Sequence, residues 1–216
     1  MTQRIICVIF AGVLLLLTMQ HVTAQEVVDR IVARVENDII LLSDIQELRR
    51  YQEFLDGKSE TDAQLLDRLI DQWIVRTEAD VARFPPPSDP DIERGLERLK
   101  RSFASPEEYE ERKTKSALND AEIRRITASQ LYLSNYLDSR FRPSVQIDEK
   151  QIQDFYQNSV VPRAKARGQE PPTLDAARDA IQEVLVQQGI NEQADRWLKE
   201  SRGRLHVEPL LEQGTK

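Results

Sequence analysis

The sequence is poor in the residue types that most enzyme and metal sites require. It contains one cysteine, Cys7, and two histidines, His21 and His206. A single cysteine cannot form an intramolecular disulfide, and neither histidine lies in a metal-binding or catalytic motif. Only seven of the 216 residues are glycine, and no glycine-rich phosphate loop occurs. We therefore expect no catalytic residue, no metal site and no cofactor, and we assign His206 to a strand surface.

Basic residues are outnumbered by acidic ones. The chain has 30 lysines and arginines against 37 aspartates and glutamates, which gives a net charge of −7. An acidic surface repels the phosphate backbone of nucleic acids. We therefore expect no nucleic-acid partner.

The longest apolar run lies at the N-terminus. Arg4 precedes an apolar stretch over residues 5–19, and Val22-Thr23-Ala24 precedes a polar Gln25. One positive charge, a short apolar core and small residues are typical of a cleaved secretory signal, residues 1–24, with cleavage between Ala24 and Gln25. The alternative is a membrane anchor, but a spanning helix needs about 20 apolar residues and this run is shorter. The pattern predicts an exported protein without a stable membrane span.

Two segments predict strands. Residues 28–41 alternate Ile31, Ala33 and Val35 with other residues, and Asn37-Asp38 is typical of a hairpin turn. An isolated hairpin is marginally stable in water, so it needs a third strand or a covering helix. We expect the segment 205–210 to supply that strand, which would bring the two ends of the exported chain together.

Residues 43–202 are predicted to be mostly helical. Start signals recur along this stretch at Ser43-x-x-Gln46, Thr61-x-x-Gln64, Asp89-Pro90, Ser105-Pro106, Asn119-x-x-Glu122, Asp148-x-x-Gln151 and Thr173. Pro85-Pro86-Pro87, Pro143 and Gly203 are stop signals. Residues 158–172, rich in Pro, Arg, Lys and Gly, are expected to form an exposed linker. The fold class is therefore mainly α, with a small sheet made by the hairpin and a C-terminal strand.

The aromatic residues are the main candidates for a binding surface. Trp73, Phe103, Phe141 and Trp197 lie on apolar helix stripes and are assigned to the core. Tyr109, Tyr132 and Tyr136 lie off these stripes, and the last two share one helix face because they are four residues apart. A tyrosine combines an apolar ring with a polar hydroxyl, so these three are the predicted contacts for extended, unfolded chains.

Three segments resemble the SurA-type periplasmic chaperones. The run VVDRIVARVENDIILLSD over residues 27–44 resembles the opening of that family in residue types and spacing. Residues 140–156 look like its link between the chaperone helices and a parvulin isomerase domain. Residues 176–207 are similar to the long helix and final strand that pack back on the hairpin. The resemblance implies a SurA-like chaperone module of residues 25–157 and 173–211, joined by the linker.

The sequence also departs from this family. Its members carry one or two parvulin domains between the second and third segments, where this chain has only residues 157–172, with no histidine or cysteine. The resemblance therefore implies a chaperone module without a prolyl isomerase domain, and so no enzyme.

Three functions remain open from the sequence. The leading hypothesis is an exported, ATP-independent holdase that binds unfolded outer-membrane or secreted proteins in the periplasm. The alternatives are a prolyl isomerase, as relatives of the family would suggest, and an adaptor that binds one folded partner of the cell envelope. A holdase should suppress the aggregation of several unrelated proteins, whereas an adaptor should capture one partner.

Overall fold

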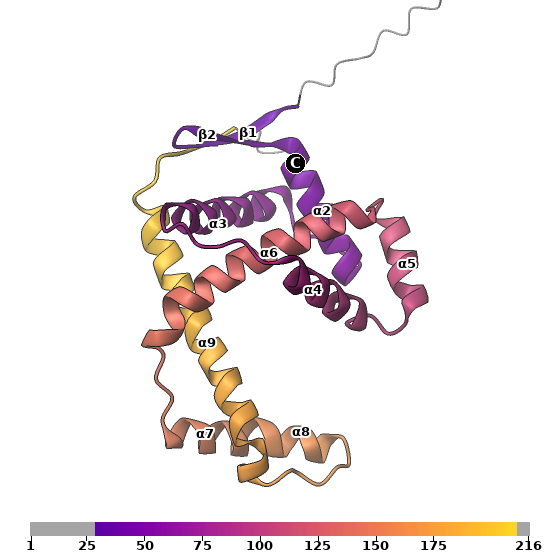
Figure 1. Cartoon of the computed structure of the whole chain (residues 1–216), viewed down its shortest axis with the longest axis vertical. Helices are drawn as coiled ribbons and strands as arrows, with labels where there is room; N and C mark the ends of the chain where they lie inside the picture. Colours follow the sequence, from indigo (N-terminus) through magenta and orange to yellow (C-terminus); the bar gives the residue numbers. More distant parts are fainter. Residues whose placement is uncertain (1–28, 211–216) are drawn as a thin grey trace, which may run out of the picture.

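The computed structural model describes residues 29–210 and is mainly α-helical with one small sheet (Figure 1). This confirms the predicted fold class. The predicted signal, with Ala24 and Gln25, lies outside the described residues. In chain order the elements are β1 (Ile31–Val35), β2 (Asp38–Leu41), α2 (Leu42–Asp56), α3 (Asp62–Val81), α4 (Asp89–Arg101), α5 (Pro106–Lys115), α6 (Asp120–Phe141), the 3-10 turn η2 (Arg142–Ser144), α7 (Glu149–Phe155), the π-turn η3 (Tyr156–Val160), α8 (Val161–Ala166), α9 (Leu174–Arg202) and β3 (Val207–Pro209).

The sheet is antiparallel with the strand order β2-β1-β3. The hairpin turns at Glu36, whose φ of 52° is left-handed, and at Asn37. β3 pairs with β1 over Ala33–Pro209, Arg34–Glu208 and Val35–Val207. The hairpin and the C-terminal third strand are therefore confirmed, although the turn is Glu36-Asn37, one residue earlier than the predicted Asn37-Asp38.

The predicted alternation of the hairpin is wrong at Ile31 and Val32. Val32, Ala33 and Val35 are fully buried, whereas Ile31 is only partly buried. The register between β1 and β2 shifts between Ile31 and Ala33, as at a β-bulge. A bulge places two residues opposite one, so consecutive side chains on either side of it can face the core.

Most predicted helix starts are confirmed. Side chains of Thr61, Ser105, Asn119, Asp148 and Thr173 accept hydrogen bonds from the backbone of the first turn of α3, α5, α6, α7 and α9. Two starts are wrong by one or two residues. α4 is capped by Ser88 rather than Asp89, and α2 starts at Leu42, where the Asp44 carboxylate accepts the Leu41 N–H at 2.8 Å. Because Asp44 caps the chain from inside the helix, Ser43 is not the cap.

The helix ends also agree with the sequence. α3 ends at Val81, before the three prolines, α6 ends at Phe141, before Pro143, and Gly203 is the C-cap residue of α9.

The predicted exposed linker 158–172 is mostly exposed, but its first half is helical rather than an irregular connection. η3 and α8 continue α7 as far as Ala166, and only the residues after them leave the helix. Pro162 has no N–H to donate, and it lies directly after the π-turn η3, where the α-helical hydrogen-bond pattern is already interrupted. Val160 packs against the small apolar cluster that contains Ile152 and Ile181. This part of the segment therefore helps to bury that cluster.

The long helix α9 connects two parts of the molecule (Figure 1). Its C-terminal half carries Trp197 and Leu198, which pack against the sheet–α3 cluster and against the α3–α6 cluster. Its N-terminal half carries Ala177 and Ile181, which pack against Ile152 of α7 at the lower end of the view. The aromatic residues assigned to the core do pack against it, although Trp73, Phe103, Phe141 and Trp197 are only partly buried.

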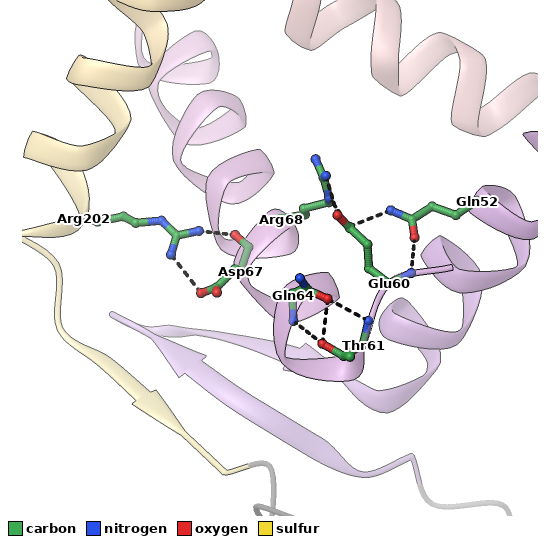
Figure 2. A network of polar contacts seen from close by, with 7 residues as sticks. All are labelled: Gln52, Glu60, Thr61, Gln64, Asp67, Arg68 and Arg202. Carbon is green, nitrogen blue, oxygen red and sulfur yellow. Dashed lines mark hydrogen bonds and ion pairs between the residues drawn. The ribbon is translucent and has the colours of Figure 1, made fainter. Parts of the chain in front are cut away.

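Polar contacts hold the N-terminal half of α3 against its neighbours (Figure 2). Arg202 at the end of α9 donates to the Asp67 carboxylate at 2.9 Å, to the Asp67 carbonyl, and to Asp71 at 2.7 Å. At the start of α3, Glu60 accepts from Gln52 at 2.9 Å and from Arg68 at 2.6 Å. These contacts hold α9 and α2 against α3.

Among residues 29–210, none of the helices combines the length and apolar character needed to cross a bilayer.

Replacing Arg202 by glutamine should destabilise the whole domain, because the guanidinium joins α9 to two carboxylates of α3. Hydrogen bonds to charged groups contribute about 1.5–3 kcal/mol, so we expect Arg202→Gln to lower the free energy of unfolding by about 2 kcal/mol in urea titrations. The control Arg196→Gln removes an exposed arginine of the same helix and should have little effect. Equal stability of the two variants would contradict this role.

The pH dependence of stability should include a contribution from Glu60. Hydrogen bonds from Arg68 and then from Gln52 lower the pKa of Glu60 to about 2, from 4.5. The folded state therefore binds this proton less readily than the unfolded state. The stabilisation is present above pH 4.5 and is lost as the pH falls towards 2.

Melting curves recorded through this range should show a smaller acid-induced fall in Tm for Glu60→Gln than for the wild type. The control Glu170→Gln removes an exposed carboxylate outside the network and should keep the wild-type profile. A Glu60→Gln profile that parallels the wild type would show that the carboxylate makes no such contribution.

Candidate functional site

Tyr109 is a packed residue rather than an open surface contact. Its side chain is 4% exposed, and its ring lies 5.4 Å from Phe54 and 5.3 Å from Phe103, both in edge-to-face geometry. Burial raises the pKa of its hydroxyl. The ring also borders a hollow of about 410 Å³ at the corner between α4 and α5, together with Phe103 and Pro106. Tyr109 was expected outside the core because it lies off the apolar stripes, but it is buried because α5 turns this face onto α2.

Tyr132 and Tyr136 share one face of α6, as predicted, but this face is covered. Both rings pack against Phe84, at 5.9 and 5.6 Å. Tyr136 is 5% exposed and its hydroxyl accepts a hydrogen bond from Arg140 at 2.9 Å. Tyr132 is partly buried and donates to Asp80 at 2.7 Å, which raises the pKa of Tyr132. The open tyrosine face expected from the sequence is therefore occupied by α3 and the residues after it.

The structure shows a groove elsewhere, where β2, α2, α3 and α6 meet. It has a volume of about 290 Å³. Its apolar lining consists of Ile39, Ile40, Leu48, Leu69, Trp73, Ile126 and Leu133. Its walls come from parts of the chain that are far apart in the sequence, since residues from position 39 to position 133 contribute to it.

Polar side chains surround this apolar lining. Arg125 of α6 pairs with Glu47 of α2 at 2.7 Å, and Arg76 of α3 donates to the Ser129 hydroxyl of α6. The groove therefore has a rim of both charge signs. A rim of both charge signs does not favour a ligand of one charge.

Two hydrogen bonds fix the shape of the groove. The Trp73 indole N–H donates to the Asp38 carboxylate at 2.8 Å and so orients the ring beside the hairpin. The Tyr51 hydroxyl donates to the Gln130 side-chain oxygen at 3.1 Å and so connects α2 to α6. Burial raises the pKa of Tyr51 to about 12, so this hydroxyl stays protonated at neutral pH. The groove offers apolar surface and neutral hydrogen-bonding groups.

Sequence reasoning missed this groove, although α3 contains a signal for it. Its apolar arc includes Leu66, Ile70 and Ile74, which are buried, and also Leu69 and Trp73, which are only partly buried. An apolar arc wider than one packing face leaves its margin without a partner. Leu69 and Trp73 are that margin.

Within residues 29–210, no group of three or more His, Cys, Asp or Glu side chains is placed to hold a metal ion. The chain matches no protein-family model and no curated protein.

Truncating the buried side chain of Tyr136 should lower the stability of the fold. Tyr136→Ala removes a buried ring from between α6 and Phe84, and we expect a loss of about 3 kcal/mol in the free energy of unfolding. Tyr132→Phe is the control, because it keeps the ring and loses only the hydrogen bond to Asp80, at a cost of about 1 kcal/mol. Chemical denaturation measures both. A Tyr136→Ala variant as stable as the wild type would place this ring outside the core.

Proposed function

We propose that this protein is an exported, ATP-independent chaperone that holds unfolded polypeptides in the groove formed by β2, α2, α3 and α6. The observation that carries the proposal is the open apolar groove with a mixed polar rim. Apolar side chains of an unfolded client would be removed from water there, while the polar rim keeps the rest of the client solvated.

The mechanism is mass action. Binding an unfolded chain lowers its free concentration, and moderate affinity permits release without an energy source. Aggregation depends on encounters between unfolded chains, so it slows as their free concentration falls. The resemblance of residues 27–44 to the SurA-type chaperones supports this function, and the N-terminal pattern supports a periplasmic location.

The proposal includes no prolyl isomerase activity. Between the second and third segments that resemble the SurA family, the described chain forms only η3, α8 and a short connection to α9. Isomerisation would need a pocket around the proline ring with groups that stabilise the twisted amide. The groove instead combines apolar residues with rim groups that are already engaged with one another.

Filling the groove should weaken client binding without removing any core side chain. Ser129 lies on the rim, so Ser129→Trp would place an indole in the groove. We expect about a tenfold rise in Kd for an unfolded polypeptide, equivalent to about 1.4 kcal/mol. In light-scattering assays the variant should suppress aggregation less than the wild type does.

The matched control is Ser139→Trp, which makes the same change at an exposed position of the same helix. It should keep wild-type Kd and wild-type suppression of aggregation. A wild-type protein that leaves several unrelated aggregating proteins unaffected and captures one folded partner would overturn the chaperone proposal in favour of an adaptor.

A further inference from the structure

The two edges of the small sheet differ in how well they are protected. β2 and β3 are the outer strands, because both pair only with β1. An exposed strand edge is a template for another strand unless charges, prolines or bulges block it. The two edges can be compared residue by residue, because the register of both pairs is known.

The register shows which backbone groups of β2 point outward. Val32 of β1 and Glu36, the residue after β1, bond to the residues that flank β3, since Leu210 N–H donates to the Val32 carbonyl and Glu36 N–H to the His206 carbonyl. Backbone groups alternate in direction along a strand, so Arg34 also faces β3. Its partner in β2 is Ile39. The N–H and C=O of Ile39 therefore point away from β1, towards the free edge.

The same alternation explains the protection of β3. Residues 206, 208 and 210 face β1, so Val207 and Pro209 face outward. Proline has no N–H, so this edge lacks one of its outward donors. β2 carries no proline, and its sequence is Asp38-Ile39-Ile40-Leu41.

Asp44 already accepts the outward Leu41 N–H of β2, so the part of this edge left open is at Ile39, beside the groove. Ile39 is 51% exposed and pairs with the exposed Arg34, so its side chain lies on the outer face of the sheet. Ile40 is buried on the inner face. Both residues line the groove. A hollow that touches two consecutive residues of one strand, whose side chains lie on opposite faces of the sheet, lies beside the edge of that strand.

We propose that an extended segment of an unfolded client binds by adding a fourth strand to the free edge of β2. This inference rests on the proposed chaperone function and specifies how the groove is used. The client residue opposite Ile39 exchanges two backbone hydrogen bonds with it, and alternate client side chains enter the groove towards Leu69 and Trp73. Main-chain bonds supply affinity without a sequence requirement. The preferred client is a segment with apolar residues at every second position.

A proline at Ile39 tests this mode directly. Ile39→Pro removes the outward N–H and keeps the hydrogen bonds between β1 and β2, because this N–H does not face β1. The matched control is Val207→Pro, which makes the same change at an outward position of the opposite edge. The probe is fluorescently labelled, reduced and carboxymethylated lactalbumin, which cannot refold. We expect Ile39→Pro to raise its Kd about tenfold, and Val207→Pro to change it by less than about twofold.

Hydrogen exchange gives a second measurement that needs no variant. Saturating probe should slow exchange of the Ile39 amide in the wild type and leave the Val207 amide unchanged. Two peptides of the same composition extend the test. The peptide with alternating apolar residues should bind more tightly than one with apolar residues at helical spacing.

The outcomes separate the two proposals. A wild type that binds neither the probe nor any other unfolded chain overturns the chaperone function itself. A wild type that binds the probe, with Ile39→Pro binding equally and the Ile39 amide unprotected, overturns only the strand-addition mode. Sedimentation of the wild type as a dimer that Ile39→Pro dissociates, with unchanged probe affinity, would assign the edge to a second copy of this chain and also overturn that mode.

Discussion

The backbone of β1 needs hydrogen-bond partners on both sides, and it finds them at opposite ends of the described chain. β2 follows it directly, whereas β3 comes after all the helices. With a strand paired on each side, β1 lies in the middle of the sheet. Its side chains Val32, Ala33 and Val35 are buried against the apolar residues of α3. The position of β3 then fixes the C-terminal end of α9, and Arg202 holds that end on α3. α2 and α6 then pack against α3, which α9 holds in place.

The groove follows from how α2, α3 and α6 use their apolar faces. α6 must lie close to α4, and Gly95 permits this, because a Cβ there would be 2.9 Å from Leu131. α6 also covers α3 through Leu133 and Tyr136. Because these faces are covered, the margin of α3 (Leu69 and Trp73) and Ile126 of α6 remain open beside β2. The proposed chaperone function uses the apolar surface that helix packing leaves uncovered.

Charge is distributed so that the groove stays neutral. Many carboxylates of this acidic chain are paired at helix contacts, such as Glu47 with Arg125 and Asp67 and Asp71 with Arg202. Pairing keeps a single-sign field from building up at the groove. A neutral apolar surface suits a protein that is proposed to bind chains of varied sequence.

The sequence by itself determined the elements of this protein, because their signals are local. Caps at Thr61, Ser105 and Asn119 fix where helices start through bonds within one turn, and the hairpin follows from residues adjacent in the chain. The tertiary structure alone decided which faces are covered. Tyr109 and Tyr136 were expected on a surface, and they are buried because α5 and α6 pack against distant helices. The groove combines residues nearly 100 positions apart, and no local pattern specifies the distance between them. Burial depends on the sum of all packing contacts, whereas a cap depends on one turn of the chain.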